Sequence, residues 1–150
     1  MRQILTSMDI NALLYFWKEF DTYKIGTAAN STSTMHRIHS QPITMDDFET
    51  DGMSEFSTKY LRRIVEHLET HRNIYNFTGE KHYWHDIIKL LPSSYRQLRT
   101  CTLNYEVLYN MFHARQNHKL TEWHIFCDWI RTLPYANELI IHDDSAKNSE

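Results

Sequence analysis

The sequence predicts an α+β fold that is rich in helix, with a small strand or extended region after the first helix. Three observations predict this class. Apolar residues recur at helical spacing along most of the chain, Gly and Pro each occur only 3 times in 150 residues, and one uncharged stretch is rich in hydroxyl and β-branched side chains. The scarcity of Gly and Pro indicates a folded and mostly helical chain rather than a disordered one.

The first helix is expected from about Ile10 to Gly26, because Gly favours the residue after a helix end. Its apolar positions at helical spacing are Leu13, Leu14, Phe16, Trp17, Phe20 and Tyr23, with Lys18, Glu19 and Asp21 on the other face. The next stretch, Thr27 to Ser40, is almost free of charge and predicts a strand or an extended loop. A solvated loop and a rigid wall of hydrogen-bonding groups are both compatible with this composition.

A capping-box outline and two helices follow. Thr44 to Asp47 has the outline of a capping box. A long helix is expected from Ser54 or Ser57 to Tyr75, a turn at 76–79, and a helix at 80–90 that ends before Pro92.

The following helix begins after Asn104, whose side chain suits the N-cap position, and ends near Arg115. A guanidinium at a helix C-terminus interacts favourably with the helix dipole. Its planar fork also suits bidentate contact with a phosphate or with the carbonyl edge of a pyrimidine. A last buried helix is expected at 119–133, stopped by Pro134.

Length and charge narrow the function classes. The chain is expected to form one domain over residues 1–142, with a charged disordered tail at 143–150. A net charge of −3 argues against a nucleic-acid partner, and no apolar run is long enough to predict a membrane span. Two cysteines, Cys101 and Cys127, suit reduced thiols in a cytoplasmic protein.

Other kinds of site find little support in the sequence. His67 and His71 lie four residues apart, a spacing that can bind a metal, but no third ligand is marked and we predict no metal. Nothing near Cys101 or Cys127 indicates an activated thiolate. The sequence contains neither a P-loop nor a dinucleotide-binding glycine motif.

Several fixed spacings occur together in the second half of the chain. A Leu-Pro pair is followed by two Asn, an Arg, a His and a Glu, at Leu91-Pro92, Asn104, Asn110, Arg115, His118 and Glu122. This run resembles the C-terminal half of the flavin-dependent thymidylate synthases. A second family motif, Asn-Glu-x-Ser-x-Arg-Tyr, is similar to residues 30–36, where Asn30 and Ser33 keep the family's residue type.

The resemblance implies an α+β fold assembled as a homotetramer, with FAD, dUMP, NADPH and methylenetetrahydrofolate bound at subunit interfaces. It implies that Arg115 polarises the pyrimidine and that Ser33 contacts the nucleotide phosphate. It also implies that Asn104, Asn110 and His118 contact the flavin.

Three cationic positions of the family are lost in this chain. Glu106 and Met35 replace arginines, and the Arg-His-Arg tripeptide falls near Thr22-Tyr23-Lys24, which keeps one charge. A charge-assisted hydrogen bond contributes roughly 1.5–3 kcal/mol, so three lost contacts that nothing replaces weaken the binding of anionic ligands by about a thousandfold or more. FAD binding in the family's manner is therefore disfavoured.

The leading hypothesis is a short, divergent relative of viral type that binds a small nucleotide without the family's methylation. In the host cytoplasm it would sequester a dUMP-like or signalling nucleotide for a phage, in an anti-defence role. The predicted nucleotide contacts are Asn30, Ser31, Ser33, Thr34 and Arg115, followed by Tyr23, Lys24 and Arg96. Two alternatives remain open: active FAD-dependent methylation of dUMP or a related pyrimidine modification, and a non-catalytic scaffold that binds another protein.

Overall fold

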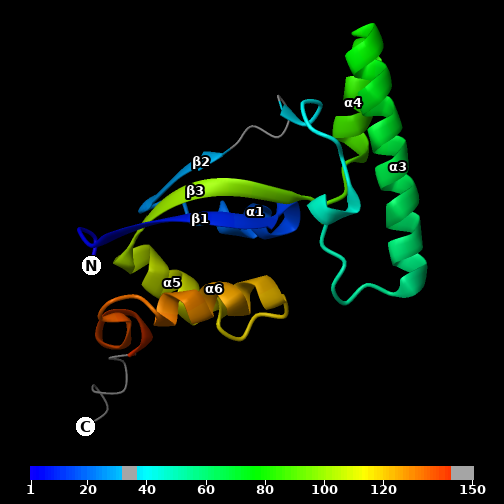
Figure 1. Cartoon of the computed structure of the whole chain (residues 1–150). Coiled ribbons are helices and arrows are strands. Elements are labelled where there is room, and N and C mark those ends of the chain that lie inside the picture. Colours follow the sequence, from blue (N-terminus) through cyan, green and yellow to red (C-terminus); the bar gives the residue numbers. More distant parts are fainter. Residues whose placement is uncertain (32–36, 143–150) are drawn as a thin grey trace. The chain divides into compact units, whose positions relative to one another are not determined.

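The computed structural model describes residues 1–31 and 37–142. Its three strands form one sheet in the order β1-β3-β2, with β1 at Leu5–Leu13, β2 at Thr27–Ser31 and β3 at Arg96–Asn104 (Figure 1). Ser7 and Thr102 share a hydroxyl hydrogen bond of 2.7 Å, and Thr100 donates to Asp9 over 2.6 Å. Because the second pair advances on one strand and retreats on the other, β1 and β3 are antiparallel.

Helices make up most of the rest of the described chain. They are α1 (Leu14–Phe20), η1 (Met45–Asp47), α3 (Glu55–Thr78), α4 (Lys81–Leu90), α5 (Tyr105–Arg115), α6 (Thr121–Arg131) and the π-helix η2 (Asn137–Ile141). The predicted helix-rich α+β class, with a strand after the first helix, is confirmed. None of the helices in these ranges combines the length and the apolar content that a membrane span requires.

Local signals placed several helix ends correctly. The Ser54 hydroxyl accepts from the backbone N–H of Ser57 and caps α3, and Asn104 caps α5 through the N–H of Val107. The capping box at Thr44 is present. However, α3 continues through the turn expected at 76–79 and ends at Gly79, whose φ of 71° is the left-handed conformation that glycine adopts without strain.

The first helix is shorter than the sequence indicated, so its prediction was wrong at both ends. Residues 10–13 belong to β1, and α1 stops at Phe20 instead of continuing to Gly26. From Thr6 to Ile10, every second side chain is partly shielded while Leu5, Ser7 and Asp9 are exposed, which is the alternation of a strand. The apolar residues from Ile10 onward also fit a helical spacing, and the pairing of β1 with β3 decided between the two.

Strand β3 was not predicted, because its alternation is hidden by polar residues on the shielded side. Gln97 and Arg99 are half-buried, whereas Leu98 on the opposite side is exposed. The guanidinium of Arg99 lies 4.3 Å from the ring centre of Trp17, and the Trp17 indole N–H donates to the carbonyl of Gln97. An arginine stem can cover an aromatic face in this way without a hydrophobic residue in the sequence.

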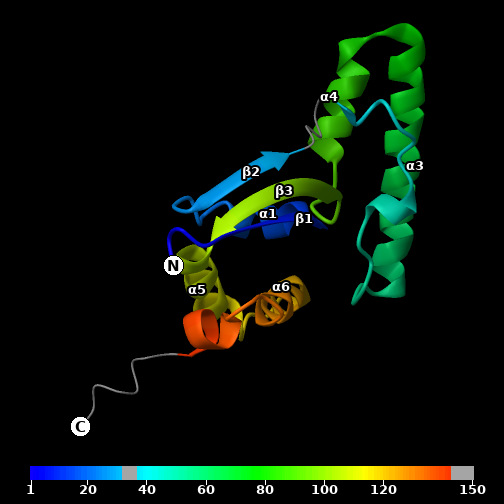
Figure 2. The same cartoon turned by 60° about the vertical axis from the view of Figure 1, so that its left-hand side comes forward.

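The chain divides into two compact units, each with its own buried side chains. The first contains Met1–Ile10, Glu19–Asn30 and the chain from Thr100 onward, and α5, α6 and η2 pack together in it (Figure 2). The second contains Asn11–Lys18 and Ser31–Arg99, with α3 and α4 as an antiparallel helical pair. The single-domain expectation stays a prediction, and the tail at 143–150 lies outside the described residues.

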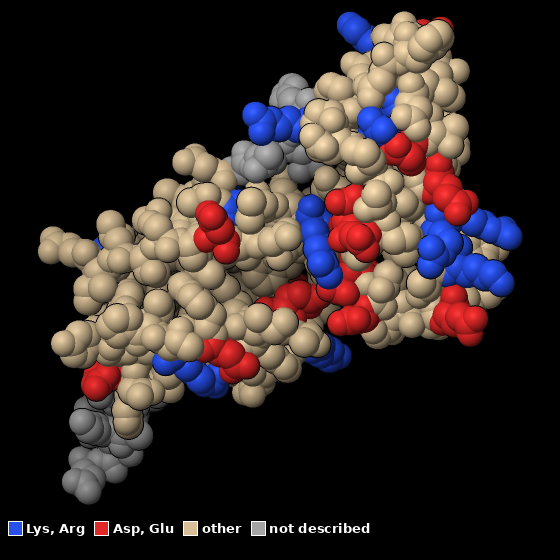
Figure 3. Space-filling view, in the orientation of Figure 1, with Lys and Arg blue, Asp and Glu red and all other residues tan. Residues whose placement is uncertain are grey.

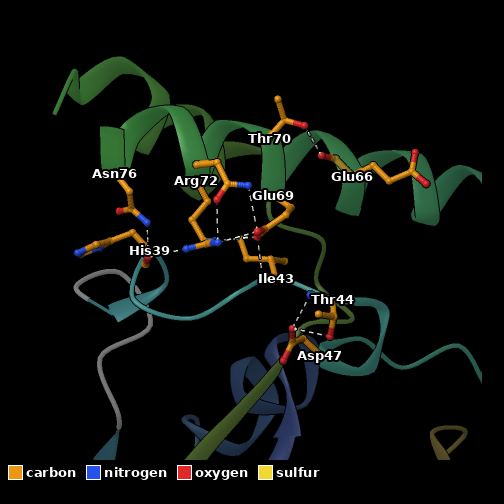
Figure 4. A network of polar contacts seen from close by, with 10 residues as sticks. His39, Ile43, Thr44, Asp47, Glu66, Glu69, Thr70, Arg72 and Asn76 are labelled. Carbon is orange, nitrogen blue, oxygen red and sulfur yellow. Dashed lines mark hydrogen bonds and ion pairs between the residues drawn. The ribbon is translucent and has the colours of Figure 1, made fainter. Parts of the chain in front are cut away.

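In the second unit, α3 holds the segment that precedes η1 through a polar network (Figure 4). The Glu69 carboxylate accepts two hydrogen bonds from Arg72, at 2.7 and 2.6 Å, and one from the backbone N–H of Ile43 at 2.8 Å. Arg72 and Asn76 both donate to the carbonyl of His39. Ile43 is buried below this network with Leu68 and Ile87. The network therefore fixes the backbone at residues 39–43.

Glu69→Gln is expected to destabilise the protein by about 1–2 kcal/mol at pH 7, because the amide cannot accept all of these hydrogen bonds. The hydrogen bonds from Arg72 hold the pKa of Glu69 below its ordinary value of 4.5. A lowered pKa means that the stabilisation is present above that value and is lost as the pH falls through the folded-state pKa. Urea unfolding of both proteins between pH 7 and pH 3 should show curves that converge in acid.

The matched control is Glu66→Gln, on the same helix. Glu66 is exposed, and its carboxylate makes no hydrogen bond within the described part of the chain. It should change stability by less than about 0.5 kcal/mol. Equal losses for the two variants would show that the network contributes nothing specific.

Candidate functional site

Arg115 is the last residue of α5, as the sequence predicted, and its guanidinium is held by residues around α1. Its Nη1 donates to the Glu19 carboxylate over 2.9 Å, and its Nε donates to the Tyr23 hydroxyl over 3.0 Å. Glu19 lies in the last turn of α1 and Tyr23 just beyond that helix. Both partners are half-buried, so this ion pair is shielded more than a surface pair.

Aromatic rings enclose the same guanidinium. Its carbon lies 4.9 Å from the ring centre of Trp123 and 5.7 Å from that of Tyr23. Trp123, in the first turn of α6, is fully buried and donates its indole N–H to Glu19 over 2.7 Å. His118 places Nε2 at 3.4 Å from the same carboxylate. Glu19 is thus the common acceptor of a cluster formed by α1, α5 and α6.

This geometry limits what Arg115 can bind. The Nε atom of Arg115 donates to Tyr23 and its Nη1 atom donates to Glu19. The remaining guanidinium nitrogen, Nη2, makes no hydrogen bond with residues 1–31 or 37–142. The positive charge is already compensated by Glu19, and a second anion placed there would also meet the Glu19 carboxylate. The cluster therefore favours an uncharged carbonyl oxygen over a phosphate as the partner of Arg115.

Glu19 and Trp123 were not predicted as members of this cluster. Glu19 was assigned to the polar face of the first helix, yet it lies next to the fully buried Phe20 and two residues after the buried Trp17. A carboxylate among buried aromatic residues needs a cationic or hydrogen-bonding partner. That requirement was a usable signal, although the sequence does not say which of the distant cations provides it.

The three predicted flavin contacts are placed differently. Asn104 is buried, its carboxamide caps α5, and a Cβ at Gly26 would lie 2.4 Å from its Nδ2. His118 accepts from the N–H of Leu120 through Nδ1. Asn110 is exposed. Two of the three side chains are thus engaged within the chain, and by themselves these residues do not fit an FAD site.

Glu106 stands where the resemblance to flavin-dependent thymidylate synthases implies an arginine, and it forms an ion pair within this chain. Its carboxylate forms an ion pair with Arg2, including a 3.1 Å hydrogen bond from Nη2. The hydrogen bond from Arg2 lowers the pKa of Glu106. The negative charge is therefore compensated locally by Arg2, a pairing that was not predicted from the sequence.

The remaining predicted nucleotide contacts of the first half lie in and around β2. Asn30 and Lys24 are exposed, and the backbone of Ser31 ends the strand. Ser33 and Thr34 lie outside the described residues. Asn30 and Lys24 are thus accessible to a ligand.

Arg96, the last predicted contact, lines a cavity of about 690 Å³ that lies wholly in the second unit. This volume is in the range of small-molecule sites, roughly 300–1,000 Å³. Four charged side chains line it together with amide, hydroxyl and apolar groups: Arg37, Arg96, Asp46, Asp47, Asn11, Gln41, Gln97, Ser40, Tyr95, Ile38, Pro42, Ile43 and Leu98. The cavity was not predicted, because its residues come from three separate parts of the sequence, Asn11, residues 37–47 and residues 95–98.

Secondary contacts hold the charged groups of the cavity. Arg96 donates to Glu49 over 2.7 Å, and Glu49 accepts from the backbone N–H groups of Thr50 and Asp51. These hydrogen bonds, the one from Asp51 first, lower the pKa of Glu49. Burial, and then the charge of Asp47, raise the pKa of Tyr95, so its hydroxyl stays protonated as a donor.

Other candidate sites are less developed. His67 and His71 stack with ring centres 4.0 Å apart, and His71 lies 3.6 Å from Asp86. In the described ranges, no three histidine, cysteine or acidic side chains are arranged to hold a metal ion. Both cysteines are buried, and burial raises the pKa of Cys127 above its ordinary value. This direction is unfavourable for a thiolate nucleophile.

The distribution of charge does not indicate a polyanion site on the face drawn in Figure 3. Over α3, basic side chains lie beside acidic ones rather than in a continuous basic area. A nucleic-acid-binding face would be expected to concentrate Lys and Arg along one groove or stripe.

Solved structures share this fold, although neither a protein-family model nor a curated protein sequence matches the chain. Two are the flavin-dependent thymidylate synthase ThyX from Helicobacter pylori, each with FAD and dUMP. One is 16% identical, with a TM-score of 0.68 over 90% of this chain and 71% of that one. The other is 15% identical, with a TM-score of 0.70 over 93% and 72%.

A third similar structure is the UMP/dUMP methylase PolB from Streptomyces cacaoi, bound with 5-Br UMP. It is 12% identical, with a TM-score of 0.63 over 91% of this chain and 72% of that chain. At these identities the likeness concerns the fold. The thymidylate synthase-like architecture predicted from the sequence is confirmed.

Proposed function

We propose that this chain binds a small uracil nucleotide on a ThyX-like fold and does not carry out reductive methylation. The observation that carries the proposal is Arg115, presented at the end of α5 on a fold that it shares with the three structures described above, each of which holds a uracil nucleotide or analogue. A fold alone does not determine function, so the proposal depends on what Arg115 can contact.

The geometry around Arg115 supports a pyrimidine rather than a phosphate at this position. Glu19 compensates the charge, and the Trp123 and Tyr23 rings fix the guanidinium. The Nη2 edge then suits the carbonyl of a uracil. The other contacts of the proposed nucleotide site are Asn30, Ser31, Ser33, Thr34, Tyr23, Lys24 and Arg96.

Absence of methylation is proposed from the flavin contacts. The Oδ1 atom of Asn104 and the Nδ1 atom of His118 each accept a hydrogen bond from within the chain. A nucleotide-binding protein without its redox cofactor would sequester its ligand, and we propose this as an anti-defence role in phage infection, with the protein acting as a homotetramer in the host cytoplasm.

One observation favours the enzymatic alternative, a working flavin-dependent methylase. The Glu106 charge, which counts against anionic cofactors, is compensated by Arg2. Both ThyX structures were solved with FAD. In this alternative, FAD would supply the hydride chemistry, and the chain would hold the pyrimidine through Arg115.

A spectrum, mass spectrometry and calorimetry separate these functions. The purified chain is expected to be colourless, to release a nucleotide other than FAD on denaturation or to be empty, and to bind added dUMP or UMP. Thymidine is included as a control ligand without phosphate.

A yellow protein that releases FAD would replace the proposal with the methylase. A protein that releases no nucleotide and binds neither dUMP nor UMP would overturn nucleotide binding and favour a scaffold for another protein.

A further inference from the structure

An apolar stripe runs along an exposed side of the N-terminal half of α3. Phe56, Tyr60 and Ile64 follow one another at intervals of four residues, and they are 72%, 55% and 38% exposed. Residues at this interval lie on the same face of a helix. Together with residues 92–94 they line a groove of about 510 Å³ that lies wholly in the second unit. A contiguous exposed apolar surface of this kind marks an interaction site.

A row of two basic side chains borders the stripe. Lys59 and Arg63 are both exposed, and Arg63 lies over the Tyr60 ring with its guanidinium carbon 6.0 Å from the ring centre. Neither side chain forms an ion pair within residues 1–31 or 37–142. At about 100° per residue, the row lies on the other side of the stripe from the buried Leu61 and Val65. The groove therefore has core residues along one side and uncompensated positive charge along the other.

Charge and shape together define the partner that fits. Two uncompensated cations beside an apolar groove are complementary to acidic side chains that flank an apolar face. The backbone of α3 is hydrogen-bonded within its own helix, so the groove offers no strand edge to an extended peptide. A helix with apolar side chains at every third and fourth position matches the spacing of the stripe. The stripe is about 12 Å long, which corresponds to about two turns of a partner helix.

A second copy of α3 is less suitable as the partner. When two identical helices pair antiparallel about a twofold axis, each flanking row faces the same row of the other copy. Lys59 and Arg63 would then face the same two basic residues of the other copy, and like charges in contact across an interface are unfavourable. The charges thus favour an acidic chain of different sequence.

We infer that the groove along Phe56, Tyr60 and Ile64 binds an amphipathic helix of another protein, with the apolar face of that helix on the stripe and its acidic side chains at Lys59 and Arg63. The inference goes beyond the proposed nucleotide binding and does not depend on it, because none of these residues belongs to the proposed nucleotide site.

Calorimetry with three synthetic peptides tests this inference on the full chain. The first peptide, of about 15 residues, has leucine at every third and fourth position and glutamate at the flanking positions. The second has the same composition in scrambled order, and the third has lysine in place of glutamate. Wild type should bind the first peptide about tenfold more tightly than either of the others.

Variants of the groove and of the basic row give the second part of the test. Phe56→Ala should weaken binding of the first peptide by about tenfold or more. The double variant with Lys59→Glu and Arg63→Glu should weaken it by about the same factor and should bind the lysine peptide more tightly than wild type does. All three side chains are exposed, so folding is expected to be retained, and circular dichroism checks this.

Arg62→Glu is the matched control. Arg62 is an exposed arginine of the same helix, but at about 100° per residue it faces away from the stripe. Reversing its charge should leave the affinity for the first peptide within about threefold, because solvent and salt screen a charge on the far side of the helix.

Equal affinity of wild type for the first and the scrambled peptide, binding of none of the three peptides, or binding that Phe56→Ala leaves unchanged would overturn the inference. Light scattering gives an independent readout. Phe56→Ala is expected to keep the oligomeric state of wild type, and a smaller assembly would show that the groove holds a second copy instead. The variant should bind UMP and dUMP like wild type, so a failed peptide test leaves nucleotide binding intact.

Discussion

Trp123→Ala is expected to lower the free energy of unfolding by about 3–5 kcal/mol, the usual cost of deleting a buried tryptophan. Trp123 is fully buried and packs edge-on against Tyr23 and Phe126, with ring centres 6.2 and 5.8 Å away. The substitution would also remove the indole donor to Glu19 and the ring below Arg115. Packing and the polar cluster are lost together, which places this change at the upper end of single-residue effects.

Urea unfolding followed by circular dichroism measures this loss. Trp123→Phe separates the two contributions, since it keeps a ring in the core but no N–H group. It should cost roughly 1–3 kcal/mol. Ile125→Ala, on the same helix with 65% exposure, is the control and should change stability by less than about 0.5 kcal/mol. A Trp123→Ala variant as stable as this control would show that the packing and the indole hydrogen bond of Trp123 do not stabilise the first unit.

The starts of α3 and α5 were predictable because an N-cap depends on a few neighbouring residues. Ser54 and Asn104 each accept from the backbone N–H group three residues ahead. Each of these choices is made within one turn of helix, so a single sequence contains the information. The same holds for the position of Arg115 at the end of α5.

Strands β1 and β3 were not predicted correctly, because local sequence does not determine them. The apolar spacing from Ile10 is compatible with a helix, and in β3 the shielded positions include Gln97 and Arg99. Arg99 is accommodated there by the face of Trp17, a contact across more than 80 residues of sequence. Contacts between residues this far apart in the sequence determine both strands. A pattern read over a short stretch of sequence does not include both partners of such a contact.

The candidate site has the same limitation. Arg115 was chosen from the spacing of its neighbours, but its ion pair with Glu19 joins residues on α5 and α1 that are 96 positions apart. This pair changes the chemistry of the predicted contact, because a compensated guanidinium favours a neutral acceptor. Residue type indicated that Arg115 can bind either a phosphate or a pyrimidine, and its partner provides the argument for choosing between them.

Arg115→Ala is expected to weaken binding of UMP or dUMP by about 10- to 100-fold, the loss of one or two charge-assisted hydrogen bonds. It also leaves Glu19 without its ion-pair partner, so stability should fall by roughly 1–3 kcal/mol. Calorimetry at a temperature where circular dichroism shows a folded variant separates the two effects. Arg131→Ala is the matched control, since Arg131 ends α6, pairs with Asp128 and lies over the Phe112 ring. Equal nucleotide affinity in both variants would exclude Arg115 from the site.

Glu19→Gln then distinguishes the two possible partners of Arg115. The amide keeps an oxygen for the Trp123 N–H but removes the negative charge beside the guanidinium. With a uracil carbonyl at Nη2, nucleotide affinity should change by less than about threefold, because a neutral oxygen responds weakly to the lost charge. With a phosphate at Nη2, the same substitution should strengthen binding about tenfold or more, since it removes the repulsion between two anions. We expect the smaller change, and the larger one would move the phosphate to Arg115 and the pyrimidine elsewhere.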